Sequence, residues 1–143
     1  MITIGFTGSR YGMSPAQLSG VTRLLDAWCA LDHVVTAVHG GCLGSDEEFH
    51  RLALARGVEV HVRPSTLTRW NAPLQTSPGV IWYPPRLPLV RNRDIVTQVR
   101  AAGGVMIACP DHRAHSGTRR TANYARCVGV EVTTIVQDGF HGS

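Results

Sequence analysis

Hydrophobic positions along the chain alternate between short apolar runs and longer segments with helical spacing. The apolar runs predict five strands, at residues 2–6, 34–38, 58–62, 105–109 and 130–136. Strands that alternate with helices across short connections form parallel sheets with helices on both faces. We therefore predict one doubly wound α/β domain of about five parallel strands over residues 1–136, followed by a frayed tail at 137–143.

Local signals predict where the helices begin and end. Ser14, Pro15 and Gln17 supply an N-cap, a first-turn proline and a glutamine three residues after the cap, as in a capping box. Ser45 with Glu48 fits a second capping box. Further helical patterns cover residues 89–102 and 118–128, and glycines follow each pattern as stop signals.

The stretch from Pro64 to Pro88 is rich in proline and irregular, except that residues 80–83 fit a short extra strand. A loop of this length in a compact domain is more often a binding lid than a spacer. Trp70 lies within it and has two interpretations, one as a stacking surface for a base and one as an anchor for the loop.

Small residues gather where three predicted strands give way to helices. The backbone N–H groups of such turns, with the positive end of a helix dipole, bind phosphate. In parallel sheets these turns share one edge, where ligands bind. Purely structural tight turns are the alternative, and Ser45 and Thr118 fit simple N-caps. The candidate binding residues of the turns are Gly8, Ser9, Arg10, Gly40, Gly41, Gly44, Ser45, Asp46, Ser116, Gly117 and Thr118.

Charged residues refine this expectation. The acidic run at 46–48 would repel phosphate, so we expect sugar hydroxyls near Asp46 and phosphate near Gly117 and Thr118. The segment Arg91, Asn92 and Arg93 fits a phosphate clamp at a helix start, and a solvated helix face is the alternative. The loop with His112, Arg113 and His115 fits a solvated segment. We expect structural roles for His39 and His50.

All fourteen cationic side chains are arginine, the net charge is +4 and the pI is about 9.2. The absence of lysine excludes Schiff-base chemistry and a Walker-type phosphate-loop lysine, although codon bias also explains it. Arginine favours bidentate recognition of phosphate or carboxylate. The excess charge indicates a polyanionic partner, either a nucleotide or DNA.

The remaining composition is that of an ordinary globular protein. No apolar run approaches the ~20 residues of a membrane helix, and the first residues lack a charged signal-peptide start. Four cysteines without C-x-x-C spacing favour reduced thiols in the cytoplasm over a zinc site or disulfides. We expect no membrane partner, no bound metal and no cofactor.

The ordered motifs resemble a known superfamily. Gly8-Ser9-Arg10, then Gly40-Gly41-x-x-Gly44-x-Asp46 with His50, then Arg91-Asn92-Arg93 and Ser116-Gly117-Thr118 are similar to the Rossmann-like SLOG superfamily. This superfamily joins the DNA-processing protein A family with the "lonely guy" phosphoribohydrolases. The chain looks most like its small, stand-alone nucleotide-binding members, some of them encoded by phages. The resemblance covers residues 2–136.

The resemblance implies a pocket for a phosphorylated nucleoside or nucleotide-sugar, in a sensor or sequestering protein that could self-associate. Two other functions stay open. The phosphoribohydrolases carry a catalytic glutamate where this chain has Thr121, so an N-glycosidase would need Asp46, Glu47 or Asp111. The DNA-processing resemblance implies weak single-stranded DNA binding, with Trp70, Trp82 and Tyr83 available for stacking.

Overall fold

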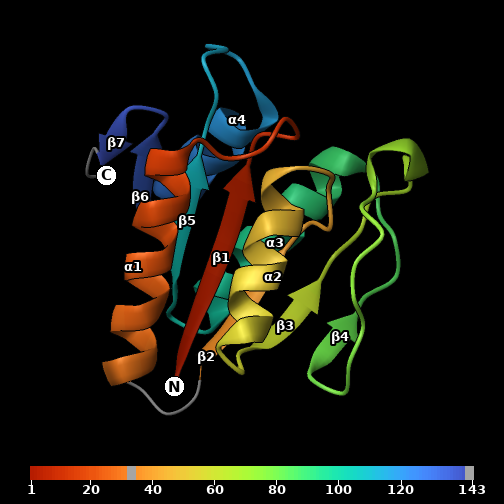
Figure 1. The fold of residues 1–143 in the computed structure, drawn as a ribbon. Coiled ribbons are helices and arrows are strands. Elements are labelled where there is room, and N and C mark those ends of the chain that lie inside the picture. The colour runs from red at the N-terminus through yellow and green to blue at the C-terminus, as the bar shows by residue number, and fades with distance from the viewer. Residues whose placement is uncertain (32–34, 141–143) are drawn as a thin grey trace.

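A computed structural model describes residues 1–31 and 35–140 as an α/β domain (Figure 1). Six strands are parallel and a short seventh is antiparallel, in the order β4-β3-β2-β1-β5-β6-β7. The strands are β1 (Ile2–Gly8), β2 (Val35–His39), β3 (Glu59–Val62), β4 (Val80–Trp82), β5 (Val105–Cys109), β6 (Glu131–Val136) and β7 (Gly139–Phe140). The helices are α1 (Pro15–Leu31), α2 (Ser45–Ala55), α3 (Pro88–Ala101) and α4 (Gly117–Cys127), with a 3-10 turn η1 (Thr68–Trp70).

The parallel doubly wound fold is confirmed, with six parallel strands where the sequence predicts about five. The additional strand is β4, which pairs with β3 through Val60 and Val80. It is three residues long and lies within residues 80–83, where the sequence already fits a short extra strand. Residue 34, assigned to a strand from the sequence, lies outside the described residues.

The chain end differs from the predicted frayed tail. Gly139 and Phe140 form β7, which pairs with Val136 and Ile135 of β6 across a tight turn. Residues 141–143 lie outside the described part of the chain. Backbone pairing of two residues leaves no hydrophobic signature, so the sequence pattern missed this hairpin.

Helix starts follow local signals in one case and tertiary contacts in another. At α1, Gln17 N–H donates to Ser14 Oγ and Ser14 N–H donates to Gln17 Oε1, which confirms the capping box. At α2 the predicted box is wrong. Gly44 is the N-cap, and the Glu48 carboxylate accepts a hydrogen bond from Met13 N–H at 2.7 Å instead.

The core forms one apolar layer on each face of the sheet. In Figure 1, α1 and α2 lie in front of the strands, and α3 and α4 lie behind them. Ile4, Phe6 and Phe49 belong to the front layer, and Phe6 stacks on Phe49 with ring centroids 4.4 Å apart. Ile95 and Met106 belong to the rear layer. Burial of both faces explains the nearly continuous apolar character of the strands.

The strand order reverses between β1 and β5. From β1 the chain proceeds outward to β2, β3 and β4, then returns to add β5 and β6 on the other side. Ligands of open α/β sheets bind at this switch point, beyond the carboxyl ends of the strands. The fold therefore points to the ends of β1 and β5 as the place to look for a site.

Two further findings concern membranes and thiols. No helix within the described residues is long and apolar enough to cross a membrane. All four cysteines are free thiols, and the described residues contain no group of three or more His, Cys, Asp or Glu placed to hold a metal ion.

Candidate functional site

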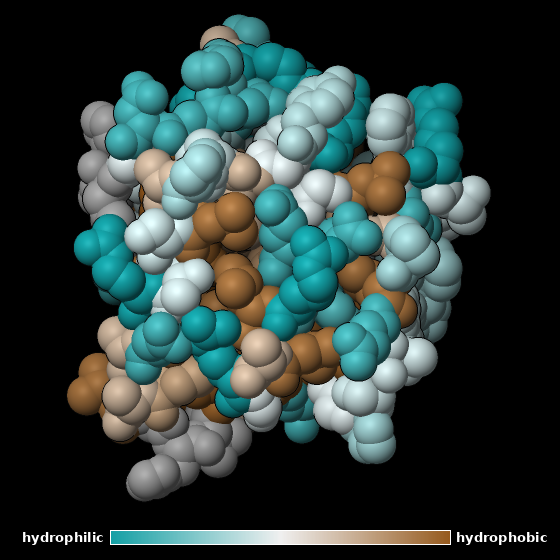
Figure 2. Space-filling view, in the orientation of Figure 1, coloured by the Kyte–Doolittle hydropathy of each residue, from teal (hydrophilic) through white to brown (hydrophobic). Residues whose placement is uncertain are grey.

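A cavity of about 270 Å³ opens at the carboxyl ends of the strands, beside the switch point. It lies between β1, the turn after β2, the 65–70 segment and the first turns of α3 and α4. Figure 2 shows that the surface at this end of the molecule is mainly hydrophilic. Leu67 and Leu89 add apolar side chains to the cavity wall, 43% and 63% exposed.

Most of the residues predicted from the sequence meet at this cavity. Those that line it are Gly8, Ser9, Arg10, Gly40, Asp46, Trp70, Arg91, Asn92, Gly117 and Thr118. Those that do not are Gly41, Gly44, Ser45, Arg93 and Ser116. Sequence reasoning missed Cys42, Ser65, Leu67 and Leu89, and assigned the lining residue Arg113 to solvent. The one available signal was an apolar residue within the irregular stretch, Leu67, and another directly after it, Leu89.

Three of the residues that do not line the cavity, Gly41, Gly44 and Ser45, support the turns beside it. Gly44 has a φ of +82° and packs against the backbone of Arg10, a place where a side chain would not fit. Ser45 lies under Gly8 and donates its N–H to Ser9 O at 3.0 Å. Gly41 donates its N–H to a buried histidine ring. These contacts fix the turns, so the two glycines and the backbone of Ser45 act on the shape of the cavity.

Arg91 is a structural clamp on the turn that follows β2 at Gly40. It is 6% exposed, and its Nη1 donates to Gly40 O at 2.5 Å and to Arg63 O at 3.3 Å. Its Nε donates to Asn92 Oδ1 at 2.8 Å. A side chain at Gly40 would reach the guanidinium at 2.5 Å, which explains glycine there. The expected phosphate clamp at Arg91 therefore already has protein partners.

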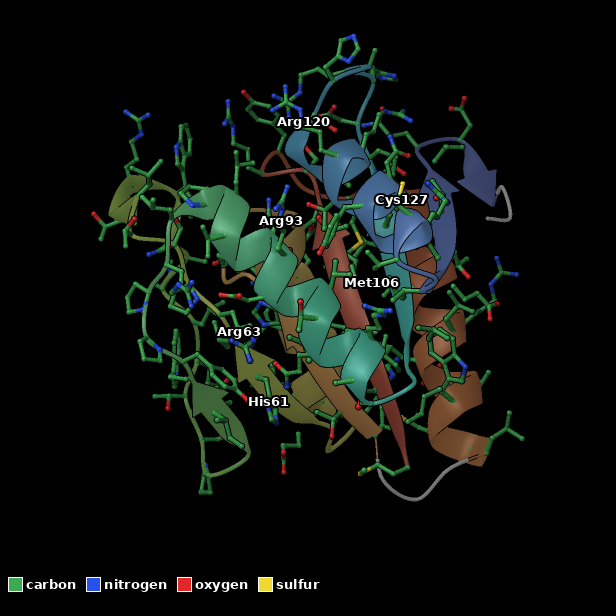
Figure 3. The ribbon with its side chains drawn as sticks, turned by 180° about the vertical axis from the view of Figure 1, so that it is seen from behind. His61, Arg63, Arg93, Met106, Arg120 and Cys127 are labelled. Carbon is green, nitrogen blue, oxygen red and sulfur yellow. The ribbon has the colours of Figure 1, made fainter. Side chains whose placement is uncertain are left out.

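Arg93 lies away from the cavity. It is exposed, and its guanidinium carbon lies 5.1 Å from the ring centroid of Tyr124 on α4. Figure 3 shows Arg93 on the rear side of the molecule, where α3 and α4 cover the sheet. Residues two apart on a helix point about 200° apart, so Arg91 and Arg93 cannot share one pocket.

Asp46 presents a buried carboxylate to the cavity. The side chain is 5% exposed, and Oδ2 accepts a hydrogen bond from Cys42 N–H at 3.2 Å. Oδ1 is buried and lacks a hydrogen-bond partner within the described structure. Burial raises the pKa of Asp46 to about 6, although the Arg91 charge and the N–H groups of Cys42 and Gly40 act in the opposite direction.

Arg10 lines the cavity and contacts two aromatic rings. Its guanidinium carbon is 4.1 Å from the centroid of Trp70 and 5.1 Å from that of Tyr11. Nη2 donates to the Tyr11 hydroxyl at 3.1 Å, whereas the buried Nε has no partner in the described structure. The Trp70 ring therefore holds an arginine in place, so a base has to compete with Arg10 for that ring.

The first turn of α4 offers free backbone donors at the cavity. Ser116 is the N-cap, and its Oγ accepts from Arg119 N–H at 3.2 Å, so the expectation of Thr118 as the cap is wrong. Gly117 and Thr118 lie in the cavity wall. Thr121 is buried and donates its hydroxyl to Gly117 O at 2.8 Å within the helix.

A chain of hydrogen bonds ties the 64–88 segment to the turn after β2. Gly41 N–H donates to His39 Nδ1 at 2.9 Å, so His39 carries its proton on Nε2 and donates to His50 Nδ1 at 2.9 Å. His50 Nε2 then donates to Gln75 O at 2.8 Å. Burial lowers the pKa of His39 to about 3, helped by His50 and Arg91. Both imidazoles therefore have the structural role expected from the sequence.

Backbone bonds complete this attachment. Leu43 N–H donates to Trp70 O and Ala72 N–H donates to Gly41 O, both at 2.8 Å. The 65–75 part of the irregular segment is thus a fixed wall of the cavity in this structure.

The two other candidate carboxylates are engaged elsewhere. Glu47 pairs with Arg51 one turn along α2, at 4.0 Å. Asp111 pairs with Arg113 at 2.9 Å and accepts from Ser9 Oγ. Burial tends to raise the pKa of Asp111, but the hydrogen bonds from Arg113 and Ser9 outweigh it and lower the pKa to about 2. Neither residue lines the cavity.

Comparison with solved structures supports the fold. The chain is similar to the X-ray structure of TM1055, a Northeast Structural Genomics Consortium target, with a TM-score of 0.63 and 16% sequence identity. The match covers 92% of this chain and 72% of TM1055. No protein-family model and no curated protein matches the chain. The likeness is to a Rossmann-like fold, in agreement with the strand order.

Proposed function

We propose that the cavity binds a phosphorylated nucleoside or a nucleotide-sugar, such as an adenine nucleotide or an ADP-ribose-like compound, and that the protein acts as its sensor or sequesters it. One observation carries this proposal. Two buried groups on this cavity have opposite polarity, the Arg10 Nε donor and the Asp46 Oδ1 acceptor, and neither has a partner among the residues that the structure describes. Unsatisfied buried groups are costly, and a ligand with both phosphate and hydroxyl groups would satisfy the two together.

The surroundings suggest how such a ligand would lie. Phosphate would meet the N–H groups of Gly117 and Thr118 and the guanidinium of Arg10, and sugar hydroxyls would donate to Asp46. Leu67 and Leu89 would contact the base, since both are apolar and line the opening. The motif resemblance to the SLOG superfamily supports the same assignment, including Gly8, Ser9 and Arg10 at the floor of the pocket.

Arg10→Ala is expected to weaken nucleotide binding by about tenfold or more, because a hydrogen bond to a charged group contributes roughly 1.5–3 kcal/mol. Calorimetry with mononucleotides, dinucleotides and nucleotide-sugars measures this effect. Arg93→Ala is the matched control, an exposed arginine outside the cavity, and should leave the affinity unchanged. If the folded protein binds no nucleotide at millimolar concentration, the proposed function is wrong.

N-glycosidic cleavage of a nucleoside monophosphate is a second candidate, favoured by Asp46. A carboxyl group with a pKa of about 6 exchanges protons readily near neutral pH. Water would add to the anomeric carbon as the N-glycosidic bond breaks, and the base would leave with a proton. The phosphoribohydrolases have a catalytic glutamate where this chain has Thr121. Cleavage would therefore use a carboxyl at another position, such as Asp46.

If the protein has this activity, chromatography should detect free base released from nucleoside monophosphates, and Asp46→Asn should abolish the release. Glu47→Gln is the matched control, since Glu47 lies beside Asp46 in the chain but faces Arg51. Base release that persists in Asp46→Asn contradicts the assignment of this carboxyl.

Single-stranded DNA is tested in the same calorimetric series. A groove that neutralises several phosphates loses affinity steeply with salt, whereas one or two arginines give a shallow slope. Tyr83 lies under Arg63, with 3.7 Å between guanidinium carbon and ring centroid, and Trp82 does not line the cavity. We expect DNA binding to be weak and strongly dependent on salt.

A further inference from the structure

A second cavity, of about 290 Å³, lies along α4 on the side that faces β6. The 110–114 segment overhangs it, and α4 and β6 form its walls through Arg119, Asn123, Arg126 and Thr134. Thr118 lines both this cavity and the first one. Both cavities therefore reach the first turn of α4, where the N–H groups of Gly117 and Thr118 have no partner among the described residues.

The walls of the second cavity carry positive charge without a matching carboxylate. Arg119 donates to the carbonyl oxygens of Arg113 and Asp111, at 2.9 and 3.1 Å. Arg126 donates to Thr134 Oγ1 at 2.6 Å and to Asn123 Oδ1 at 3.3 Å. Neither arginine pairs with a carboxylate among the residues that the structure describes. Both hold neutral oxygen atoms, so their charges remain available to an anion.

The two helices at the site carry opposite charges in their first turns. The first turn of α2 contains Asp46, Glu47 and Glu48, as the helix dipole favours. The first turn of α4 contains no acidic residue and holds Arg119 and Arg120, which the dipole disfavours. An anion bound over the first turn of α4 would offset the unfavourable interaction between these arginines and the helix dipole. The anionic part of a ligand therefore belongs at α4, between the two cavities.

We propose that the ligand is a nucleoside diphosphate joined to a second sugar-bearing group, and that it spans both cavities. This inference rests on the proposed function and deepens it. The first cavity holds the nucleoside, with a hydroxyl on Asp46, and the diphosphate crosses the first turn of α4 at Thr118. The second cavity holds the distal sugar, whose hydroxyls meet Asn123, Thr134 and the arginines.

The sizes of the cavities agree with a two-part ligand. Ligand sites generally measure about 300–1,000 Å³. Each cavity, at about 270 and 290 Å³, matches the smallest of these sites, so each has room for one part of such a ligand. A mononucleotide would leave the second cavity and its two arginines without a ligand.

Calorimetry on the full chain with paired probes tests the proposal. ADP-ribose and AMP form one pair, and UDP-glucose and UMP form the other, because the residues of the first cavity do not specify the base. We expect at least one two-part compound to bind about tenfold or more tightly than its mononucleotide. Equal affinity within both pairs would overturn the two-part ligand and leave the proposed nucleotide site standing. Failure of all four to bind would overturn both.

Variants at the second cavity locate the distal group. Ala114 is exposed and lines only the second cavity, so Ala114→Trp should fill it and reduce the affinity for the two-part compound to that of the mononucleotide. Binding of the mononucleotide should not change. His112→Trp is the matched control, in the same loop but outside both cavities.

A second variant covers the case in which Ala114→Trp disturbs the loop. Arg126→Ala removes an exposed cation nine residues along α4, and should weaken only the two-part compound, by about fivefold or more. Equal losses for both members of a pair in either variant, in protein that melts like the unmodified chain, would overturn the proposal.

Discussion

Replacement of Arg91 by alanine is expected to lower the free energy of unfolding by about 3 kcal/mol or more, because it removes a buried cation and leaves buried carbonyls without donors. The side chain is 6% exposed and donates to Gly40 O, Arg63 O and Asn92 Oδ1. Urea denaturation measures the change as a lower midpoint at unchanged slope.

Two further variants give this prediction its controls. Arg93→Ala removes the same side chain two residues later, where it is exposed, and should cost less than about 1 kcal/mol. Arg91→Lys should recover only part of the loss, since one ammonium group cannot reproduce the planar fork of donors. A loss below about 1 kcal/mol in Arg91→Ala would contradict the clamp, and Arg91 would then be free to bind a ligand.

Asp46→Asn is expected to change the pH dependence of stability. The pKa of Asp46 is about 6 in the folded protein and close to 4 in an unfolded chain. Below pH ~4 both states are protonated, and the carboxyl contributes no pH dependence. Between pH ~4 and ~6 only the unfolded state releases its proton, so stability falls as the pH rises, by about 1.4 kcal/mol per unit. The loss is complete above pH ~6 and totals about 3 kcal/mol.

His39 changes the stability of the fold in the opposite direction over the same pH range. Its pKa is about 3 in the folded protein and close to 6.5 when unfolded, so stability is lost as the pH falls below 6.5. In the unmodified protein these two effects oppose each other. Asp46→Asn removes one of them, so the variant should lose stability on acidification more steeply than the unmodified chain.

Denaturation curves at several values between pH 4 and pH 7 test this expectation. As the pH rises from 4 to 7, the free energy of unfolding of Asp46→Asn relative to that of the unmodified protein should increase by about 3 kcal/mol. Glu47→Gln, a change to the neighbouring carboxyl, should give parallel curves. Parallel curves for Asp46→Asn as well would contradict the raised pKa. A carboxyl that lowers stability at neutral pH is typical of a functional site.

The sequence by itself determined the fold class and the location of the cavity. Apolar periodicity depends on local spacing, and the alternation of strands with helices leaves few arrangements other than a parallel sheet. Since the carboxyl ends of such strands share one edge, the turns at Gly8, Gly40 and Gly117 had to approach one another. For the same local reason the cap of α1 at Ser14 was predictable, because its partner Gln17 is three residues away.

The tertiary structure decided what the polar residues do at that edge. Helical spacing separates Arg91 from Arg93, but only packing against the turn at Gly40 determined which of them turns inward. Trp70 and Arg10 are sixty residues apart in the chain, and their contact depends on how the irregular segment folds back. The second cavity likewise arises between α4 and β6, from residues that carry no shared pattern. Contacts between distant residues leave no periodic trace in a sequence, so these features became visible only in the folded chain.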